Sequence, residues 1–188
     1  MNDLVLIALK GEAPELVDKP GVFYTGVGKV NAAIIAATLI ERYKPKRVFN
    51  FGTAGGITVD HGGIFKCTKF SQRDLKVSGC IVGQDAVDAC APITFSTDGL
   101  HVSTGDNFVT DPADAQGADL VDMEAYAIAK ACRDANVEFI CYKYVSDRAD
   151  DNAADNFQDN IYKGQDYYIS ILKENNVYWG WKSILDIS

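Results

Sequence analysis

The chain has 188 residues, of which 47% are hydrophobic and 23% are charged, and its net charge at pH 7 is −8. This length and composition are typical of one globular domain, so we expect residues 1–188 to form a single domain. The excess of acid argues against a nucleic-acid partner, and the apolar runs are too short to span a membrane.

The cysteines and histidines predict neither a metal site nor a disulfide framework. The chain has two histidines and five widely spaced cysteines, which are Cys67, Cys80, Cys90, Cys132 and Cys141. We therefore expect no metal and no cofactor, and a reduced cytoplasmic setting is the simplest account of this pattern. Asp3 stands where a secretory leader would carry basic residues, which argues against a signal peptide.

The first part of the chain alternates predicted strands with a predicted helix. Apolar runs predict strands at residues 4–9, 22–25 and 47–51. A helix is predicted over residues 29–43, ending before Pro45. Its apolar stripe is made of Val30, Ala33, Ile34 and Ala37, widened by Ala36, Leu39 and Ile40.

Two glycine-rich segments follow predicted strands. Gly26-Val27-Gly28 has the position of a dinucleotide fingerprint but lacks its third glycine and its later acid, so a tight turn is favoured over a ligand contact. Residues 52–56 place three glycines around Thr53, where backbone amides can approach an anion, a water or a sugar. A plain turn is the alternative for that segment.

The second half continues the alternation of strands and helices. Strands are predicted around residues 64–70, 99–103 and 137–145, and helices over residues 123–136 and 156–173. Within residues 61–100, a loop rich in Gly, Ser and Asp is expected after residue 70. The pattern predicts an α/β fold with three layers, α/β/α, around a central mixed, largely parallel sheet.

Three polar segments lie at positions that suit a ligand site. Residues 122–124, Asp-Met-Glu, open a predicted helix, where the helix dipole and capping also favour acids. Ser146 and Asp147 end a predicted strand, where acids are often catalytic in α/β folds but also serve as caps. Phe108 follows a turn and is either a core residue or an aromatic that stacks on a planar base.

Taken together, Asn50–Gly56, Val121–Ala125 and Tyr144–Asp147 resemble the purine nucleoside phosphorylase and nucleosidase superfamily. The resemblance is closest to the branch that hydrolyses methylthioadenosine and S-adenosylhomocysteine. It is clearest over residues 24–57, 103–109 and 121–150, and only loose over residues 61–100. It implies hydrolysis of the N-glycosidic bond of adenine-type purine nucleosides, with release of free base and sugar.

The resemblance also implies the catalytic residues. Glu12 matches the glutamate that activates the attacking water, and Asp147 matches the acid that protonates the leaving purine. Ser146 would orient Asp147. This division of labour between two carboxylates suits a reaction whose transition state is an oxocarbenium-like sugar.

Further matching positions imply substrate binding. Thr53 would lie near the attacking water, or near phosphate in a phosphorylase, and Phe108 and the backbone of Val109 would bind the purine. Met123 would pack under the sugar, and Glu124 would accept hydrogen bonds from the ribose hydroxyls. The small-molecule partner expected is thus a purine nucleoside.

Two functions are alternatives to nucleoside hydrolysis, and the sequence also predicts an oligomeric state. A phosphate-dependent phosphorylase is the first alternative, but Asn50 stands where the resemblance would place a phosphorylase arginine, and residues 11–23 offer Lys19 and no arginine. The second is a purine-binding protein that has lost catalysis, with Glu12 misplaced. The apolar surplus of the helix over residues 29–43, together with the resemblance, implies a homodimer.

Overall fold

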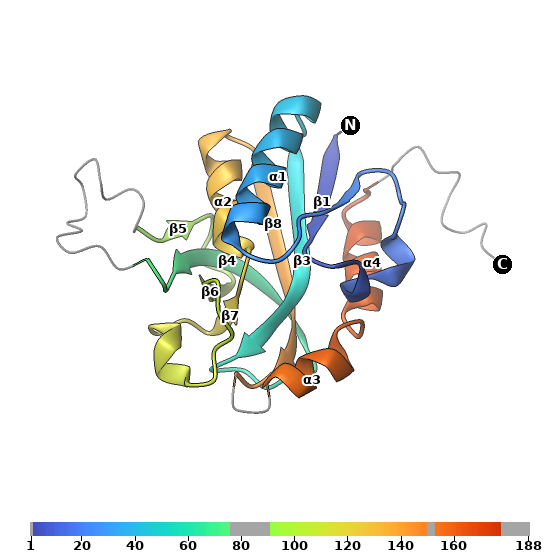
Figure 1. Ribbon diagram of the computed structural model, residues 1–188. Helices are drawn as coiled ribbons and strands as arrows, with labels where there is room; N and C mark the ends of the chain where they lie inside the picture. The colour runs from blue at the N-terminus through green and yellow to red at the C-terminus, as the bar shows by residue number, and fades with distance from the viewer. Residues whose placement is uncertain (1, 76–90, 150–152, 178–188) are drawn as a thin grey trace.

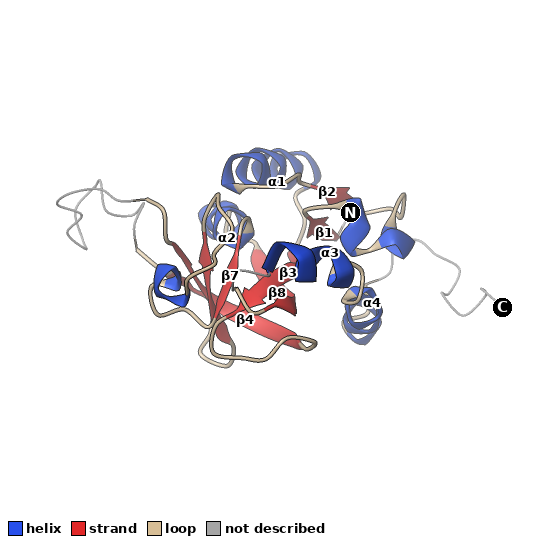
Figure 2. Ribbon diagram, turned by 60° about the horizontal axis from the view of Figure 1, so that its bottom comes forward, coloured by secondary structure: helices blue, strands red, loops and turns tan. Residues whose placement is uncertain are grey.

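One eight-stranded sheet runs through the molecule, and helices cover both of its faces (Figures 1 and 2). The computed structural model describes residues 2–75, 91–149 and 153–177. Cys80, Cys90 and most of the loop expected after residue 70 therefore lie outside the described residues.

The strands and helices have the following bounds. The strands are β1 Asp3–Ile7, β2 Val22–Tyr24, β3 Arg47–Gly56, β4 Ile64–Gln72, β5 Ile93–Thr94, β6 Leu100–Thr104, β7 Leu120–Asp122 and β8 Glu138–Asp147. The α-helices are α1 Lys29–Tyr43, α2 Ala125–Asp134, α3 Ala153–Asn160 and α4 Gln165–Glu174. Short 3₁₀ helices lie at Lys10–Glu12, Pro14–Leu16 and Pro112–Ala115.

The strand pairing confirms the mixed, largely parallel sheet. β1 is parallel to β2 and β3, β3 to β8, β4 to β6, and β6 to β7, whereas β3–β7, β4–β5 and β4–β8 are antiparallel. Because β7 pairs back onto Gly55 and Gly56 of β3, the strands β3, β8, β4, β6 and β7 form a closed ring. The ring brings the ends of β3, β7 and β8 together.

The core lies in two layers, one on each side of the sheet. Along β1, Leu4 and Leu6 pack in the cluster that includes α1 and α2, and Val5 and Ile7 pack in the cluster that includes α4. All four are fully buried, as the continuous apolar run predicts for a strand covered on both faces. Burying side chains of this size contributes about 1.5–3 kcal/mol each.

The plain turn that was the alternative for residues 52–56 is wrong, because β3 continues through Gly56. The glycines serve close packing instead of chain reversal. A Cβ at Gly55 would lie 2.9 Å from an oxygen of Asp147, and one at Gly56 would lie 2.4 Å from the carbonyl oxygen of Val59. The missing side chains therefore let an acid approach the backbone of a buried strand.

The bounds predicted for α1 are confirmed, but its predicted apolar stripe is buried only at Ala36, Leu39 and Ile40. Val30 is 68% exposed and Ile34 is 59% exposed. The helix turns its other side to the sheet, where the small side chains of Ala32 and Ala36 permit close packing beside Leu39 and Ile40. An exposed apolar strip is left on the outer face of α1.

The single helix predicted over residues 156–173 is also wrong, since α3 and α4 are separate. The Asn160 side chain donates to the carbonyl oxygen of Ser146 at 2.7 Å, which fastens the end of α3 to β8. Gly164 packs so closely on Tyr168 that a Cβ there would lie 2.3 Å from its hydroxyl oxygen. The chain changes direction between these two contacts, and α4 then returns along the sheet (Figure 1).

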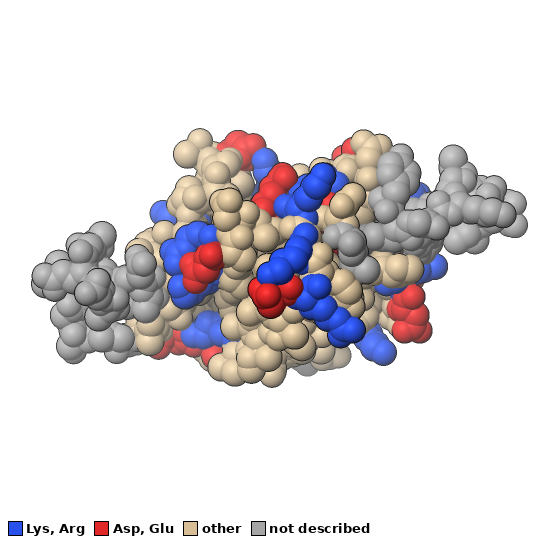
Figure 3. All heavy atoms as spheres, turned by 90° about the horizontal axis from the view of Figure 1, so that it is seen from above, with Lys and Arg blue, Asp and Glu red and all other residues tan. Residues whose placement is uncertain are grey.

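Basic and acidic side chains are interspersed on the face shown in Figure 3. Ion pairs of the described residues include Arg47 with Asp3, at 2.7 Å, and Lys44 with Glu41, at 2.5 Å. In the described ranges, no helix combines the length and the apolar character that a membrane crossing requires.

Candidate active site

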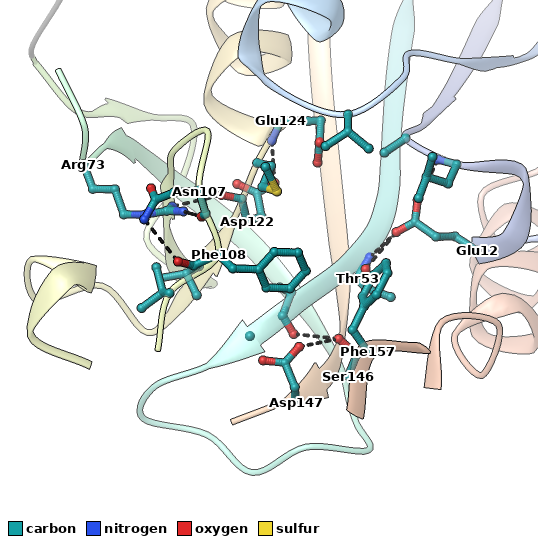
Figure 4. Close-up of a pocket in the computed structure, with 18 residues that line it drawn as sticks. Glu12, Thr53, Arg73, Asn107, Phe108, Asp122, Glu124, Ser146, Asp147 and Phe157 are labelled. Atoms are coloured by element: carbon teal, nitrogen blue, oxygen red, sulfur yellow. Dashed lines mark hydrogen bonds between the residues drawn. The ribbon is translucent and has the colours of Figure 1, made fainter. Parts of the chain in front are cut away.

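A cavity of about 140 Å³ opens at the carboxyl ends of β3 and β8 (Figure 4). Its lining includes all eight residues that the sequence singled out for a site: Glu12, Thr53, Phe108, Val109, Met123, Glu124, Ser146 and Asp147. Three of them are carboxylates that are almost fully buried, with exposed fractions of 3% for Glu12, 7% for Glu124 and 5% for Asp147. Three acids from distant segments thus face one small space.

Glu12 is held at the cavity by three hydrogen bonds. Its Oε1 accepts the backbone N–H of Thr53 at 2.7 Å and the Thr53 hydroxyl at 2.9 Å, and its Oε2 accepts the N–H of Leu9 at 2.9 Å. A Cβ at Gly52 would lie 3.2 Å from Glu12 Oε1, so the glycine gives this carboxylate its space. The short loop after β1 therefore places Glu12 directly against β3.

Asp147 lies at the end of β8 and is held from both sides. The Ser146 hydroxyl donates to Asp147 Oδ2 at 2.7 Å (Figure 4), and the N–H of Ala149 donates to Oδ1 at 2.9 Å. Because the ring of strands closes next to it, Asp147 also packs against Gly55. The carboxylate is positioned by its neighbours in sequence and by the end of β3.

Glu124 precedes α2 and accepts the N–H of Gly28 at 2.8 Å. Gly26 and Gly28 both have positive φ, of 75° and 94°, so the predicted tight turn directs an amide at this carboxylate. Burial raises the pKa of Glu124 to about 7, and the charges of Asp122 and Glu12 act in the same direction, against Lys143 and the Gly28 amide. The turn is thus part of the site.

Because its pKa is raised, Glu124 is expected to lower the stability of the folded protein at high pH. Between its ordinary pKa of 4.5 and about 7, the unfolded chain has lost the Glu124 proton while the folded protein keeps it. The stability that Glu124 contributes is therefore complete below 4.5 and is lost as the pH rises through about 7. Near pH 8, we expect the free energy of unfolding of Glu124→Gln to exceed that of the wild type by about 1–3 kcal/mol. Near pH 5, the two free energies of unfolding should be nearly equal.

Urea unfolding at the two pH values measures this difference. Glu15→Gln makes the same change at an exposed glutamate and should leave the pH dependence of the wild type unchanged. A gap between Glu124→Gln and the wild type that stays constant across this range would contradict the raised pKa.

A buried ion pair beneath the cavity was not predicted. Lys143 Nζ lies 2.9 Å from Asp122 Oδ2, and both side chains are at most 1% exposed. Burial opposes the charge of Lys143, but the negative charges of Asp122 and Glu124 outweigh it and raise the pKa of Lys143. Asp122 also accepts the Thr104 hydroxyl at 2.6 Å and the N–H of Ala125 at 2.8 Å. Capping, the structural alternative for this acid, is therefore part of its role.

Apolar side chains form the remaining wall of the cavity. Phe108 is 50% exposed, and its ring meets that of Phe157 at 5.9 Å in an edge-to-face arrangement. Val109 is buried beside them, and Met123 lies next to Glu124 on the way into α2. Phe108 is therefore a cavity residue and not a core residue, and Phe157 of α3 joins it.

The sequence missed other residues of the lining. Val27 enters through the glycine turn, Phe157 through α3, and Arg73 and Asn107 through the loops beside β4 and β6. Val27 lies in the segment Gly26–Gly28, for which the sequence favoured a tight turn over a ligand contact. Arg73 and Asn107 reach the cavity because β4 pairs with β6, which the sequence did not reveal.

Comparisons with known proteins agree with this architecture. The chain matches the Phosphorylase superfamily over residues 13–76 and 84–174. It is 34% identical over 153 residues to the 5′-methylthioadenosine/S-adenosylhomocysteine nucleosidase of Bacillus subtilis, a match that covers 66% of each chain. The chain thus spans about two thirds of the length of that relative.

Solved structures share the fold. Native futalosine hydrolase of Helicobacter pylori superimposes with a TM-score of 0.78 at 19% identity, over 93% of this chain and 98% of that one. The methylthioadenosine/S-adenosylhomocysteine nucleosidase of Colwellia psychrerythraea, in complex with adenine, superimposes with a TM-score of 0.74 at 23% identity, over 86% and 88%. Because the family match covers most of its length, the chain belongs to the phosphorylase superfamily.

Proposed function

We propose that this protein hydrolyses the N-glycosidic bond of adenine-type purine nucleosides and releases free base and sugar. The observation that carries the proposal is the convergence of three buried carboxylates, Glu12, Glu124 and Asp147, on one cavity with an aromatic wall. Clustered acids are costly in a site without function, but they suit a transition state with positive charge on the sugar. The nucleosidase names of the curated relatives support the same reaction.

In this proposal the two ends of the cavity have different tasks. Asp147 donates a proton to N7 of the leaving purine, and Ser146 holds that carboxyl group in place. Glu12 takes a proton from water as the water attacks the sugar, with Thr53 fixing the carboxylate. Glu124 accepts the ribose hydroxyls and places negative charge near the cationic sugar.

Phe108 and Val109 bind the purine in this arrangement, and Met123 packs under the sugar. Phe108 contributes a ring and Val109 a backbone, so the base is held by stacking and by main-chain hydrogen bonding. The solved nucleosidase that shares this fold was determined with adenine bound, which supports an adenine-type base.

Water is a better nucleophile for this cavity than phosphate. Arg73 is the one cation among the described residues that line it, and its terminal nitrogens are engaged by backbone carbonyls. Asn50, which stands where the resemblance would place a phosphorylase arginine, is buried and donates to the carbonyl oxygens of Leu6 and Phe51. A phosphate dianion would need fixed cations that these residues do not supply.

The test of the proposal is release of free base from methylthioadenosine, adenosine and inosine, with and without phosphate. We expect phosphate-independent release and a higher kcat/KM for the adenine nucleosides than for inosine. A sugar 1-phosphate product would establish the phosphorylase alternative. Binding of adenine, seen as a rise in Tm, without any release of base would establish the binding-protein alternative.

The role of Glu124 predicts discrimination at the 2′ position. Glu124→Ala should lower kcat/KM for adenosine by about 10-fold to 100-fold more than for 2′-deoxyadenosine, because only the ribonucleoside loses a charged hydrogen-bond partner. Met123→Leu changes the adjacent apolar wall and should affect both substrates alike. Equal losses for both substrates in Glu124→Ala would assign Glu124 to the structure of the helix start instead.

We also propose that the protein is a homodimer. The support is the apolar strip on the outer face of α1, where Val30 and Ile34 are more than half exposed and Val27 of the cavity lining lies just ahead of them. Light scattering is expected to give twice the monomer mass, and a stable, active monomer would reject the dimer.

We further propose a cytoplasmic setting and a single domain over residues 1–188. The free thiols of Cys67, Cys132 and Cys141 are consistent with a cytoplasmic setting.

A further inference from the structure

Arg73 lines the cavity and has no place in the reaction described above. It follows β4 and is 5% exposed, and its two terminal nitrogens donate to backbone carbonyls, whereas its Nε has no hydrogen-bond partner among the described residues. Nη1 donates to the carbonyl oxygens of Ser103 at 2.5 Å and Asp122 at 2.9 Å, and Nη2 to those of Gly105 at 3.2 Å and Asn107 at 2.6 Å. One guanidinium thus joins four acceptors, and Figure 4 shows its bonds to Asn107 and Asp122.

These acceptors belong to separate segments of the site. Ser103 lies in β6, Asp122 ends β7 immediately before Met123, and Gly105 and Asn107 lie in the loop that carries Phe108. The acceptors are neutral, so the charge of Arg73 is buried without a bonded carboxylate, and burial lowers its pKa. Burying a cation that is not bonded to a carboxylate costs free energy, which indicates that the planar donors of Arg73 serve to hold these segments in place.

The surroundings of Arg73 are shaped to hold it. A Cβ at Gly105 would lie 2.8 Å from both Cζ and Nε of Arg73, so a side chain at that position would collide with the guanidinium. The backbone of the next residue, Asp106, donates to Asp74 at 2.8 Å, and Gln116 donates to the carbonyl oxygen of Arg73 at 2.7 Å. The loop of residues 105–109 is therefore tied to the end of β4 at several points.

We propose that Arg73 is a positioning residue that fixes the loop of residues 105–109 against the segment entering α2. It thereby sets the spacing between Phe108 and Val109 on one side and Met123 and Glu124 on the other. The inference rests on the proposed function, in which the first pair binds the base and the second the sugar. This positioning role, which we call the Arg73 clamp, affects the affinity for the base and leaves the proton transfers of Glu12 and Asp147 unchanged.

The experiment measures adenine affinity and steady-state kinetics in three variants. Arg73→Met removes the donors, Arg73→Lys supplies one ammonium that cannot reproduce the planar fork, and Gly105→Ala pushes the guanidinium from its place. We expect the Kd for adenine and the KM for the nucleoside to rise about 10-fold or more in Arg73→Met, with kcat within about 3-fold of wild type. Arg73→Lys should be intermediate, and Gly105→Ala should resemble Arg73→Met.

Arg47→Met is the matched control. Arg47 also ties segments together, through Asp3 and the carbonyl oxygen of Asn175, but it lies six residues before Thr53 on β3, about 20 Å away. It should lower Tm without changing adenine affinity. If Arg73→Met does not fold, Arg73→Lys and Gly105→Ala decide the question.

Amide hydrogen exchange of the unliganded protein separates the clamp from the proposed function. Exchange over residues 105–109 should rise in the Arg73 variants and not in Arg47→Met, whether or not the wild type hydrolyses nucleosides. If the wild-type protein releases no base, the proposed function is rejected, but hydrogen exchange over residues 105–109 still tests the role of Arg73. Unchanged exchange in that loop, or a loss of kcat with adenine affinity unchanged, would overturn the clamp.

Discussion

Asp147→Asn is expected to lower the rate of base release by about 10²–10⁴ while leaving adenine affinity within about 10-fold of wild type. An amide at this position can still accept the N–H of Ala149 and bond to the Ser146 hydroxyl, so the end of β8 should keep its shape. It has no acidic proton for the purine, and loss of a general acid costs about 10²–10⁴ in rate. Single-turnover release of adenine from methylthioadenosine measures the effect.

Ser146→Ala is the control for this result. It keeps the carboxyl group and removes only the hydroxyl that donates to it at 2.7 Å, so we expect a smaller loss, of about 10-fold. If Asp147→Asn turns over at a rate near that of wild type, Asp147 is not the general acid.

Glu12→Gln is expected to lower kcat by about 10²–10⁴ with little change in adenine affinity, because it removes the base that deprotonates water and leaves the purine wall untouched. The substitution also sets an amide NH₂ against one of the backbone donors, Leu9 or Thr53, that now bond to the carboxylate. A loss of about 1–3 kcal/mol of stability should accompany the loss of rate.

The effects on rate and on stability are separated by Thr53→Ser and by temperature. Thr53→Ser keeps the hydroxyl that donates to Glu12 at 2.9 Å and should retain most of the activity. Assays well below the Tm of Glu12→Gln remove its instability from the comparison. Activity of Glu12→Gln close to wild type under those conditions would exclude Glu12 as the general base.

Local pattern was sufficient for much of the fold. The bounds of α1 follow from Gly28 before the helix and Pro45 after it, and β1 follows from its continuous apolar run. The face that α1 buries could be predicted only in part from periodicity, because alanine and isoleucine both count as apolar. Close packing on the sheet selects the small side chains of Ala32 and Ala36 and leaves Ile34 outside.

Contacts between distant segments explain what the sequence did not reveal. Residues 52–56 carry the glycines of a turn, but their pairing with β8 and β7 keeps them in a strand. The eight site residues could be named because the resemblance to the superfamily assigns them, and the structure places them around one cavity. Arg73 could not, since its partners are backbone carbonyls, which every residue possesses, and nothing in the sequence marks the four that converge on it.

The measurement that tests the central claim most directly is hydrolysis of methylthioadenosine in ¹⁸O-labelled water, with phosphate present and both products analysed by mass spectrometry. We predict free adenine and a sugar that carries one ¹⁸O atom, since the water activated by Glu12 supplies the new oxygen at the anomeric carbon. An unlabelled sugar 1-phosphate, or no release of adenine by the folded protein, would contradict the assignment of this cavity as the site of a nucleoside hydrolase.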